Sequence, residues 1–406
     1  MGHSHSHDDV HVEVGTLAKR ILFGFLGVLA VLTLAGLIWL WPTQAEIADG
    51  IHHVETPAGI VDTTGTITAV EESCEGQFDP DVGSLQCLIF TVEIEGGPDA
   101  GSQADVQVTG PPTQAGLRVG DQIDITRIET PDGPLYSYKS IDRTPVFIAL
   151  GLLFVAAVLA VARWKGLFAL LGLVVAGGVL IGFIIPGILL GKPGIAVALV
   201  GSTAIMFVVL YLAHGISTRT STALAGTMLG LAVTAGLGAL SVEAARLTGF
   251  ADETEMDLQQ LAGGINFQEL LIAAIIIGGL GVLNDTTITQ SSAVFELRSA
   301  APHLTRREIF ASGMRIGRDH IASTIYTIVF AYAGSALVVI MLVYFTIDDV
   351  LGTLNQELFA SEIVRTLGSS IGLILSVPLT TAIAALTVGP ARVEGAVPAR
   401  AAVPGD

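Results

Sequence analysis

The sequence predicts a mainly α-helical membrane protein with about eight transmembrane helices and one small β-rich domain outside the membrane. Apolar residues make up 51% of the 406 residues and charged residues 14%, against about 25% in an ordinary soluble domain. The mean hydropathy is +0.69. These values exclude a disordered chain, a collagen and a cytosolic enzyme. The formal net charge of −18 argues against a nucleic-acid partner, because nucleic-acid binders carry basic surfaces.

The helices are predicted from apolar stretches that approach the roughly 20 residues needed to cross the hydrocarbon core of a bilayer. These stretches are continuously apolar, whereas the strands of a transmembrane barrel alternate. The first span follows a His-rich tail, residues 1–20. The other seven form a membrane domain over residues 146–388, which precedes a tail of residues 389–406. The eight predicted spans are residues 21–41, 146–161, 167–190, 195–213, 224–240, 269–288, 321–345 and 367–388.

Basic residues near the span ends predict the orientation, because cytoplasmic loops are enriched in Lys and Arg. Lys19 and Arg20 precede the first span and predict a cytoplasmic N-terminus. Eight spans then predict a cytoplasmic C-terminus and an extracytoplasmic domain over residues 43–144. A cleaved signal peptide is the alternative for the first span, but its apolar run exceeds the usual length of roughly 7–15 residues. The loops predicted to be cytoplasmic carry Arg163, Lys165, Arg219, Arg298, Arg306, Arg307, Arg315 and Arg318.

The extracytoplasmic domain is predicted to be a small barrel of the OB type. Its apolar segments are rich in Val, Ile and Thr, often alternate, and are bounded by Gly, Pro and Asp. Several short strands in a domain of this size are typical of OB-like barrels, although the fold alone does not identify a ligand. The predicted strands are residues 64–70, 85–94, 104–108, 122–128 and 136–141.

The two cysteines of the chain, Cys74 and Cys87, both fall in this domain. We expect them to form a disulfide, because a translocated domain meets an oxidising compartment. Two free thiols are the alternative, and a metal site would need further ligands. The loop between them contains Asp79 and Asp81, which we interpret as a solvated acidic loop rather than a calcium site, because a calcium loop needs a glutamate at its twelfth position.

Histidines alternate with other residues at the N-terminus, at His3, His5, His7 and His11. Such a tract suits weak, exchangeable binding of zinc, nickel or copper, because it imposes no coordination geometry. The alternative is a disordered tail or a remnant of expression design. The sequence predicts no other cofactor.

The sixth span ends in a polar cluster that follows a strongly apolar half. An ionisable group at membrane depth costs at least about 2.5–3.5 kcal/mol and usually faces the interior of a bundle or water. Asp285 could therefore coordinate a cation or relay a proton, with neutral ligands beside it. The alternative is an interfacial helix end, where Asp285 touches headgroup water. The candidate residues are Asn284, Asp285, Thr286, Thr287 and Gln290.

The seventh span opens with a second polar group. At helical spacing Asp319, Ser323 and Tyr326 share roughly one face, which could complete a polar pocket with Asp285. The alternative is that Arg318 or Arg315 neutralises Asp319 at the membrane interface.

Two polar motifs resemble those of the YibE/F-like family of bacterial membrane proteins. One is the segment 278–285, Gly-Gly-Leu-Gly-Val-Leu-Asn-Asp, with the Thr- and Ser-rich residues after it. The other is the segment 312–324, which begins Ser-Gly-Met-Arg-Ile-Gly-Arg-Asp-His and continues into residues 330–334. The resemblance implies a multi-pass protein of the bacterial plasma membrane, with one N-terminal span, a β-rich outer domain and a multi-span block. It implies no reaction or substrate.

The chain contains no P-loop, no His-Glu-x-x-His motif and no Gly-x-Ser-x-Gly motif, so we expect no enzyme activity. The polar clusters favour a transport-related protein in the lipid bilayer, either a permease or an accessory subunit for a small solute or ion. Its protein partner would be a second copy of the chain or another membrane subunit. The alternative is a non-transporting envelope scaffold or binding protein whose outer barrel recognises a partner. Dry packing around Asp285 would favour that alternative.

Overall fold

The computed structural model describes residues 14–50, 59–71, 87–131, 133–345 and 349–391. The chain divides into two compact units, one formed by residues 1–51 with 161–406 and the other by residues 52–160. The first unit is a helical bundle. The second contains a β-sheet followed by the beginning of a long helix.

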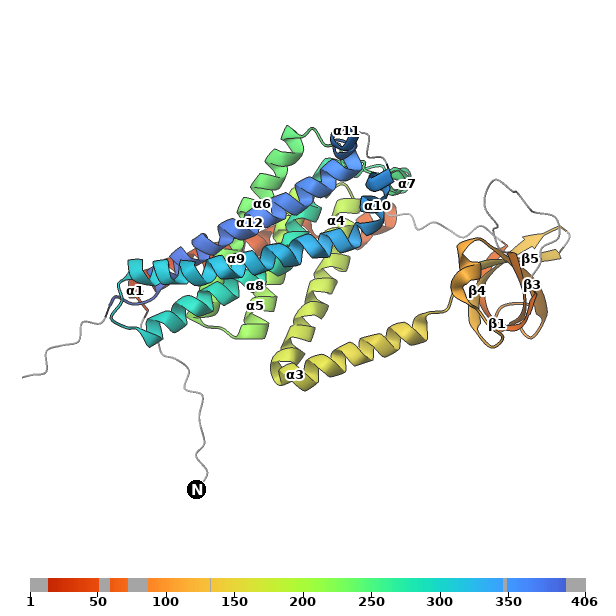
Figure 1. Ribbon diagram of the computed structural model, residues 1–406, viewed down its shortest axis with the longest axis horizontal. Helices are drawn as coiled ribbons and strands as arrows, with labels where there is room; N and C mark the ends of the chain where they lie inside the picture. The colour runs from red at the N-terminus through yellow and green to blue at the C-terminus, as the bar shows by residue number, and fades with distance from the viewer. Residues whose placement is uncertain (1–13, 51–58, 72–86, 132, 346–348, 392–406) are drawn as a thin grey trace, which may run out of the picture. The chain divides into compact units, whose positions relative to one another are not determined.

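The β-sheet confirms the predicted β-rich domain and nearly closes into a barrel (Figure 1). The strands pair in the order β3-β2-β1-β4-β5, and every pair is antiparallel. The edge strands β3 and β5 also contact each other, which brings the two edges of the sheet together. This arrangement agrees with the predicted OB-like barrel of five strands. The strands are β1 (Ile60–Glu71), β2 (Cys87–Ile94), β3 (Gln103–Thr109), β4 (Gln122–Thr130) and β5 (Gly133–Ile141).

The barrel has its own core, because successive strand residues point to opposite faces of a sheet. On β2, Phe90, Val92 and Ile94 are buried while Glu93 between them is exposed. Ile67 from β1 and side chains of β3 and β4 complete the core. The alternation seen in the sequence is therefore the inward and outward alternation of the barrel wall.

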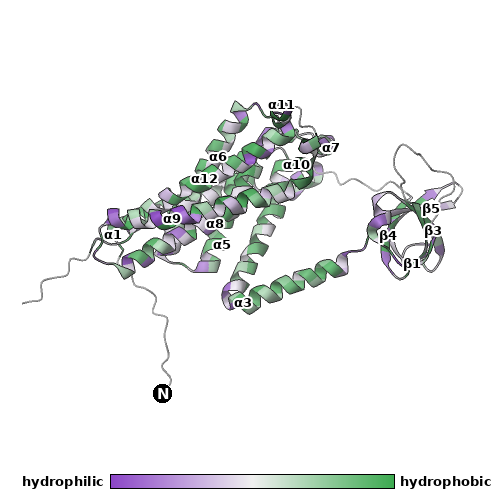
Figure 2. Ribbon diagram, in the orientation of Figure 1, coloured by the Kyte–Doolittle hydropathy of each residue, from purple (hydrophilic) through white to green (hydrophobic). Residues whose placement is uncertain are grey.

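In the helical unit, three helices pack tightly against one another and three more surround them (Figure 1). The central three are α6 (Thr218–Ala244), α8 (Phe267–Ala300) and α12 (Glu357–Thr387). Apolar residues predominate along them (Figure 2). The surrounding three are α1 (Thr16–Leu40), α5 (Gly194–His214) and α9 (Arg306–Ser335). Short helices lie between these in the chain: α7 (Glu253–Leu261) between α6 and α8, and α10 (Leu337–Phe345) and α11 (Val350–Leu354) between α9 and α12. A further short helix, α2 (Gln44–Gly50), follows α1.

Small residues allow the central helices to approach closely, in the small-xxx-small pattern that is common where membrane helices pack. A Cβ atom at Gly226 of α6 would lie 2.1 Å from the Thr380 hydroxyl oxygen on α12. A Cβ atom at Gly372 of α12 would lie 1.9 Å from the Thr234 hydroxyl oxygen on α6. Both positions therefore require glycine in this packing.

The remaining long helix is interrupted. The helix α3 (Thr144–Val179) contains Arg163 in the left-handed region, at φ +51°, so its backbone hydrogen bonding breaks there. A π-helical turn, Leu180–Ile184, and the short helix α4 (Ile185–Leu189) continue it. The sequence predicts two spans in this segment, 146–161 and 167–190, on either side of the break.

Six helices of the described residues are long and apolar enough to cross a membrane, or seven if α9 and α10, bent by 75°, count as one. In that count, residues 144–189 are a single helix.

The beginning of α1 and the end of α12 lie side by side. Val14 forms an isolated antiparallel bridge with Val388, and the Gly15 amide donates to the Thr387 carbonyl at 3.2 Å. The two ends of the helical unit therefore meet at one end of the bundle.

Candidate functional site

The two polar sequence motifs meet at Gln290. This side chain is 1% exposed, and its Nε2 atom donates to the Gly313 carbonyl on α9 at 2.8 Å. The same atom donates to Thr381 Oγ1 on α12 at 2.7 Å. One amide of α8 thus binds two other helices. We call Gln290, Gly313, Gly317, Val377 and Thr381 the Gln290 junction.

Two glycines allow α9 to reach the junction. A Cβ atom at Gly317 would lie 2.6 Å from Val377 Cγ1 and 3.1 Å from both polar atoms of the Gln290 amide. A Cβ atom at Gly313 would lie 3.0 Å from a methyl group of Thr381. The start of α9 is fixed by a capping box between Thr305 and Glu308. These glycines were not predicted to be important, although their spacing of four residues is the same small-xxx-small pattern.

Further hydrogen bonds join α8 to α6 at a similar height. The hydroxyls of Thr287 and Thr227 lie 2.6 Å apart, and both side chains are fully buried. Ser291 Oγ donates to the Arg219 carbonyl at 2.8 Å. Thr287 and Gln290, two of the predicted neutral ligands, are therefore engaged in helix–helix contacts.

Four buried polar atoms near the junction have no hydrogen-bond partner among the described residues: Asn284 Oδ1, Thr286 Oγ1, His320 Nε2 and Thr380 Oγ1. Thr286 lies one helical turn before Gln290, and His320 lies one turn after Gly317. Buried polar groups are nearly always hydrogen-bonded, so each of these atoms has capacity for water or another small ligand.

The predicted carboxylates lie on the surface of the single chain. Asp285 and Asp319 are both exposed, as is Ser323, and Tyr326 is 65% exposed. The polar pocket that the sequence suggested inside the bundle is therefore not formed by these side chains in one chain. The reason is helical rotation: α6, α9 and α12 cover the Thr286, Thr287 and Gln290 side of α8, which turns Asp285 outward.

Neither carboxylate forms an ion pair among the described residues. Arg315, one candidate to neutralise Asp319, donates instead to Ser312 Oγ at 2.7 Å. The term carboxylate face is used below for the exposed residues Asp285 and Thr289 of α8 together with Asp319, Ser323 and Tyr326 of α9.

Asp285 lies near the middle of the bundle rather than at a helix end. A Cβ atom at Gly230, near the centre of α6, would lie 2.9 Å from Leu283 and 3.0 Å from Ser376 of α12. Asp285 is only two residues beyond Leu283, about 3 Å along the helix axis. This position, near the middle of the helices along their axes, disfavours the interpretation of Asp285 as a residue at the end of a helix.

Two cavities have volumes of about 580 and 520 Å3, and neither is lined by the predicted residues. The smaller lies between α6 and the beginning of α8, where Glu243, Arg246 and Glu269 line it. The Glu269 carboxylate there accepts hydrogen bonds from the Gly194 and Ile195 amides at the beginning of α5. The larger lies between α1, α6 and α12.

The other predicted sites fall largely outside the described residues. His3, His5, His7 and His11 are outside them, as is Cys74. Cys87 begins β2, is not a free thiol, and accepts a hydrogen bond from Gln107 at 3.3 Å. The pairing of Cys74 with Cys87 stays a prediction. In the part of the chain that the structure describes, no group of three or more His, Cys, Asp or Glu side chains could hold a metal ion.

In the barrel, a small charged cluster joins β4 and β5 to the turn after β2. The Asp99 carboxylate accepts hydrogen bonds from the Tyr136 hydroxyl and from Arg127 Nε. These two donors, Tyr136 first and Arg127 second, hold the pKa of Asp99 below its ordinary value. These two hydrogen bonds stabilise the charged form of the Asp99 carboxylate.

Comparison with known proteins bears on the membrane unit. Residues 150–390 match the model of a family described as YibE/F-like protein, and this range includes both motifs that meet at Gln290. No curated protein and no solved structure shows significant similarity to the chain.

Proposed function

The chain belongs to the YibE/F-like protein family, and we propose for it a transport-related role in the bacterial plasma membrane, as a permease or an accessory subunit for a small solute or ion. The observation that carries this proposal is the exposed position of Asp285 near the middle of the bundle. A charged side chain facing hydrocarbon costs at least about 2.5–3.5 kcal/mol. The carboxylate face is therefore covered by water or by another protein chain.

The membrane topology that we propose has eight spans, with both termini in the cytoplasm and the barrel outside. The break at Arg163 divides α3 into two spans, and α9 with α10 forms one. An even number of spans agrees with the meeting of Val14 and Val388. Lys165 lies within electrostatic range of His214, which supports a common cytoplasmic end for the second half of α3 and the end of α5.

A second subunit against the carboxylate face would complete a polar path. In this path Asp285 is the group that coordinates a cation or carries a proton, and Asp319 is a second carboxylate. Ser323 and Tyr326 contribute hydroxyls. Thr286 and Asn284 line the buried side of the path with unpartnered oxygens. Thr287 and Gln290 have a structural role, because their side chains hold α6, α9 and α12 against α8.

Flux through proteoliposomes tests the proposal. The purified protein is reconstituted and assayed with protons, sodium, potassium and a divalent cation. We expect Asp285→Asn to lower the flux at least tenfold, because a neutral amide neither carries a proton nor offers a charge. The matched control is Glu296→Gln, an exposed carboxylate 11 residues further along α8, and it should retain wild-type flux. Equal flux in Asp285→Asn and an active wild type would remove Asp285 from the mechanism.

The second candidate is a non-transporting envelope protein whose barrel binds a partner. The satisfied hydrogen bonds of Gln290 favour it, as does the position of the 580 and 520 Å3 cavities, whose linings do not include Asp285. An absence of flux for every ion tested, in a preparation that keeps its helical content, would support this candidate against the first.

A further inference from the structure

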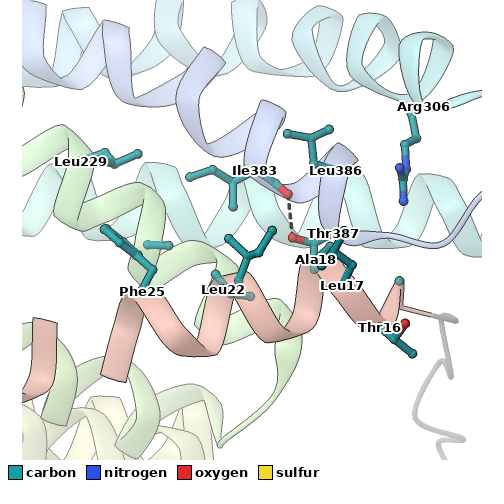
Figure 3. A pocket seen from close by; sticks show the side chains of 13 residues that line it. Thr16, Leu17, Ala18, Leu22, Phe25, Leu229, Arg306, Ile383, Leu386 and Thr387 are labelled. Carbon is teal, nitrogen blue, oxygen red and sulfur yellow. Dashed lines mark hydrogen bonds between the residues drawn. The ribbon is translucent and has the colours of Figure 1, made fainter. Parts of the chain in front are cut away.

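An apolar groove of about 580 Å3 lies between α1, α6 and α12 (Figure 3). This volume is within the range of about 300–1,000 Å3 that is typical of ligand pockets. Figure 3 shows side chains of all three helices around it, together with Arg306 at one end. Its apolar lining residues are Leu17, Ala18, Ile21, Leu22, Phe25, Ala225, Leu229, Ile383 and Leu386.

The length of the groove matches one leaflet of a bilayer. Its wall on α1 extends from Thr16 to Phe25, which is about 14 Å at the rise of an α-helix. The hydrocarbon core of a bilayer is about 30 Å thick, so one leaflet contributes about 15 Å. An extended acyl chain of one leaflet therefore fits along the groove.

The end of the groove near the beginning of α1 is basic. Arg306 lines it there, and its Nε and Nη2 atoms donate to the Val388 carbonyl at 3.4 and 3.3 Å. These two long hydrogen bonds position the Arg306 guanidinium and leave its remaining N–H groups available to bind an anion. Arg298, only 5% exposed, lies within electrostatic range of Arg306. Lys19 and Arg20 add exposed charge in the second turn of α1.

No carboxylate balances this charge in the described chain. Neither Arg298 nor Arg306 forms an ion pair there. Glu308, two residues after Arg306, accepts hydrogen bonds from the Thr305 amide and hydroxyl at 2.8 Å each, within the cap of α9. Two guanidinium groups without a carboxylate attract an anion, and the apolar groove beside them fits a hydrocarbon chain.

We propose that this groove binds an anionic phospholipid of the cytoplasmic leaflet, with an acyl chain between α1, α6 and α12 and the phosphate at Arg306. The inference depends on the proposed membrane topology but not on transport. The lipid would join α1, the first helix of the described residues, to the central bundle at the end where Val14 and Val388 meet.

Native mass spectrometry of the full chain tests this proposal. The protein is released from detergent micelles and titrated with phosphatidylglycerol or with phosphatidylcholine. We expect phosphatidylglycerol to bind about fivefold more tightly, and Arg306→Gln to abolish that preference. The matched control is Arg307→Gln, because Arg307 is exposed, adjacent and not part of the groove lining. Ala18→Phe, which fills the groove, should abolish tight binding of either lipid.

Three outcomes would overturn the proposal: equal lipid preference in Arg306→Gln and Arg307→Gln, undiminished binding by Ala18→Phe, or no tight binding by the wild type. Circular dichroism of each variant shows whether its helices are intact. Lipid binding is measured without flux, so a protein that binds phosphatidylglycerol but moves no ion contradicts the transport proposal alone. A protein with ion flux and no lipid preference contradicts only the lipid site.

Discussion

The Gln290 amide on α8 donates a 2.7 Å hydrogen bond to the Thr381 hydroxyl on α12, across 91 residues of sequence. The same nitrogen donates to Gly313 on α9 at 2.8 Å, so one side chain holds three helices in register. Helix association in a bilayer depends on close packing and interhelical hydrogen bonds, because lipid tails are as apolar as the helices. The junction supplies both, and it joins the two sequence motifs that resemble the family, both of which lie in the range that matches the family model.

The first prediction concerns the hydrogen bond itself. Thr381→Val keeps the shape of the side chain but removes the acceptor, so one Gln290 proton stays buried without a partner. We expect a loss of about 1–3 kcal/mol in the free energy of unfolding. The double variant with Gln290→Leu should lose less than the sum of the two single variants, because both partners are then apolar. Unfolding in detergent, followed by circular dichroism, measures the four stabilities.

The control for this cycle is Thr289→Val, which changes an exposed threonine of the same helix. It should alter the stability by no more than about 0.5 kcal/mol. Additive losses in the Gln290 and Thr381 variants would show that the two side chains are not coupled.

The second prediction compares two glycines, one from each motif. Gly317→Ala introduces a Cβ atom 2.6 Å from Val377 Cγ1, so the helices must separate, at a cost of about 1–3 kcal/mol. Gly281→Ala meets nothing within 4 Å and should stabilise α8 by about 0.5–1 kcal/mol through its better helix propensity. Thermal unfolding in detergent should thus give shifts of opposite sign. A destabilised Gly281→Ala with an unchanged Gly317→Ala would contradict the described packing.

The barrel could be predicted because short stretches of its sequence indicate each strand and each turn. Alternation at Phe90, Val92 and Ile94 indicates a wall with one buried face, and the turns contain Gly, Pro and Asp. The predicted strands differ from the observed ones mainly by a few residues at their ends. The family resemblance is confirmed over residues 150–390, and the apolar stretches correctly predicted long apolar helices, of which the described residues contain six rather than eight.

The rotation of α8 could not be predicted in the same way. Its first half is apolar on all sides, so no polar stripe identifies the side that packs inward. Whether Asp285 points inward or outward depends on which face α6, α9 and α12 cover, and that is decided by close contacts at Gly230, Gly313 and Gly317. Gly313 and Gly317 were not predicted to pack here, because a glycine carries no side chain that would identify its partner helix.

The third prediction concerns acid stability of the barrel. The pKa of Asp99 is lowered by the Tyr136 hydroxyl and by Arg127, and the pKa values of Asp62 and Glu95 are lowered as well. Carboxylates with a lowered pKa in the folded state stabilise it above their unfolded pKa of about 4. This contribution is lost as the pH falls through the lower folded values. The thermal midpoint of the barrel should therefore be constant from pH 7 to about 5 and decrease below pH 4.

Hydrogen–deuterium exchange of peptides from β1 to β5, measured on the full chain at increasing temperature, follows this transition in the barrel alone. Asp99→Asn should lower the midpoint at pH 7 and reduce its dependence on acid. Asp105→Asn, a barrel carboxylate that accepts a hydrogen bond from Thr91 and has no basic partner in the described chain, serves as the control. An equal acid dependence in Asp99→Asn and the wild type would show that the Asp99 cluster is not responsible.

The last prediction concerns the alternation of the helices across the membrane. Ser217 precedes α6 and His303 precedes α9, and both are exposed near the end where α1 begins. Asp257, on α7, is also exposed. It lies near the opposite end of the bundle, because α7 connects the end of α6 to the beginning of α8, where Gln268 donates to the Leu247 carbonyl.

In intact cells, a membrane-impermeant maleimide should modify Asp257→Cys and leave Ser217→Cys and His303→Cys unmodified until lysis. The unsubstituted chain sets the background labelling that its own cysteines contribute. Modification of Ser217→Cys in intact cells would contradict the proposed orientation, because Ser217 and α7 lie at opposite ends of α6.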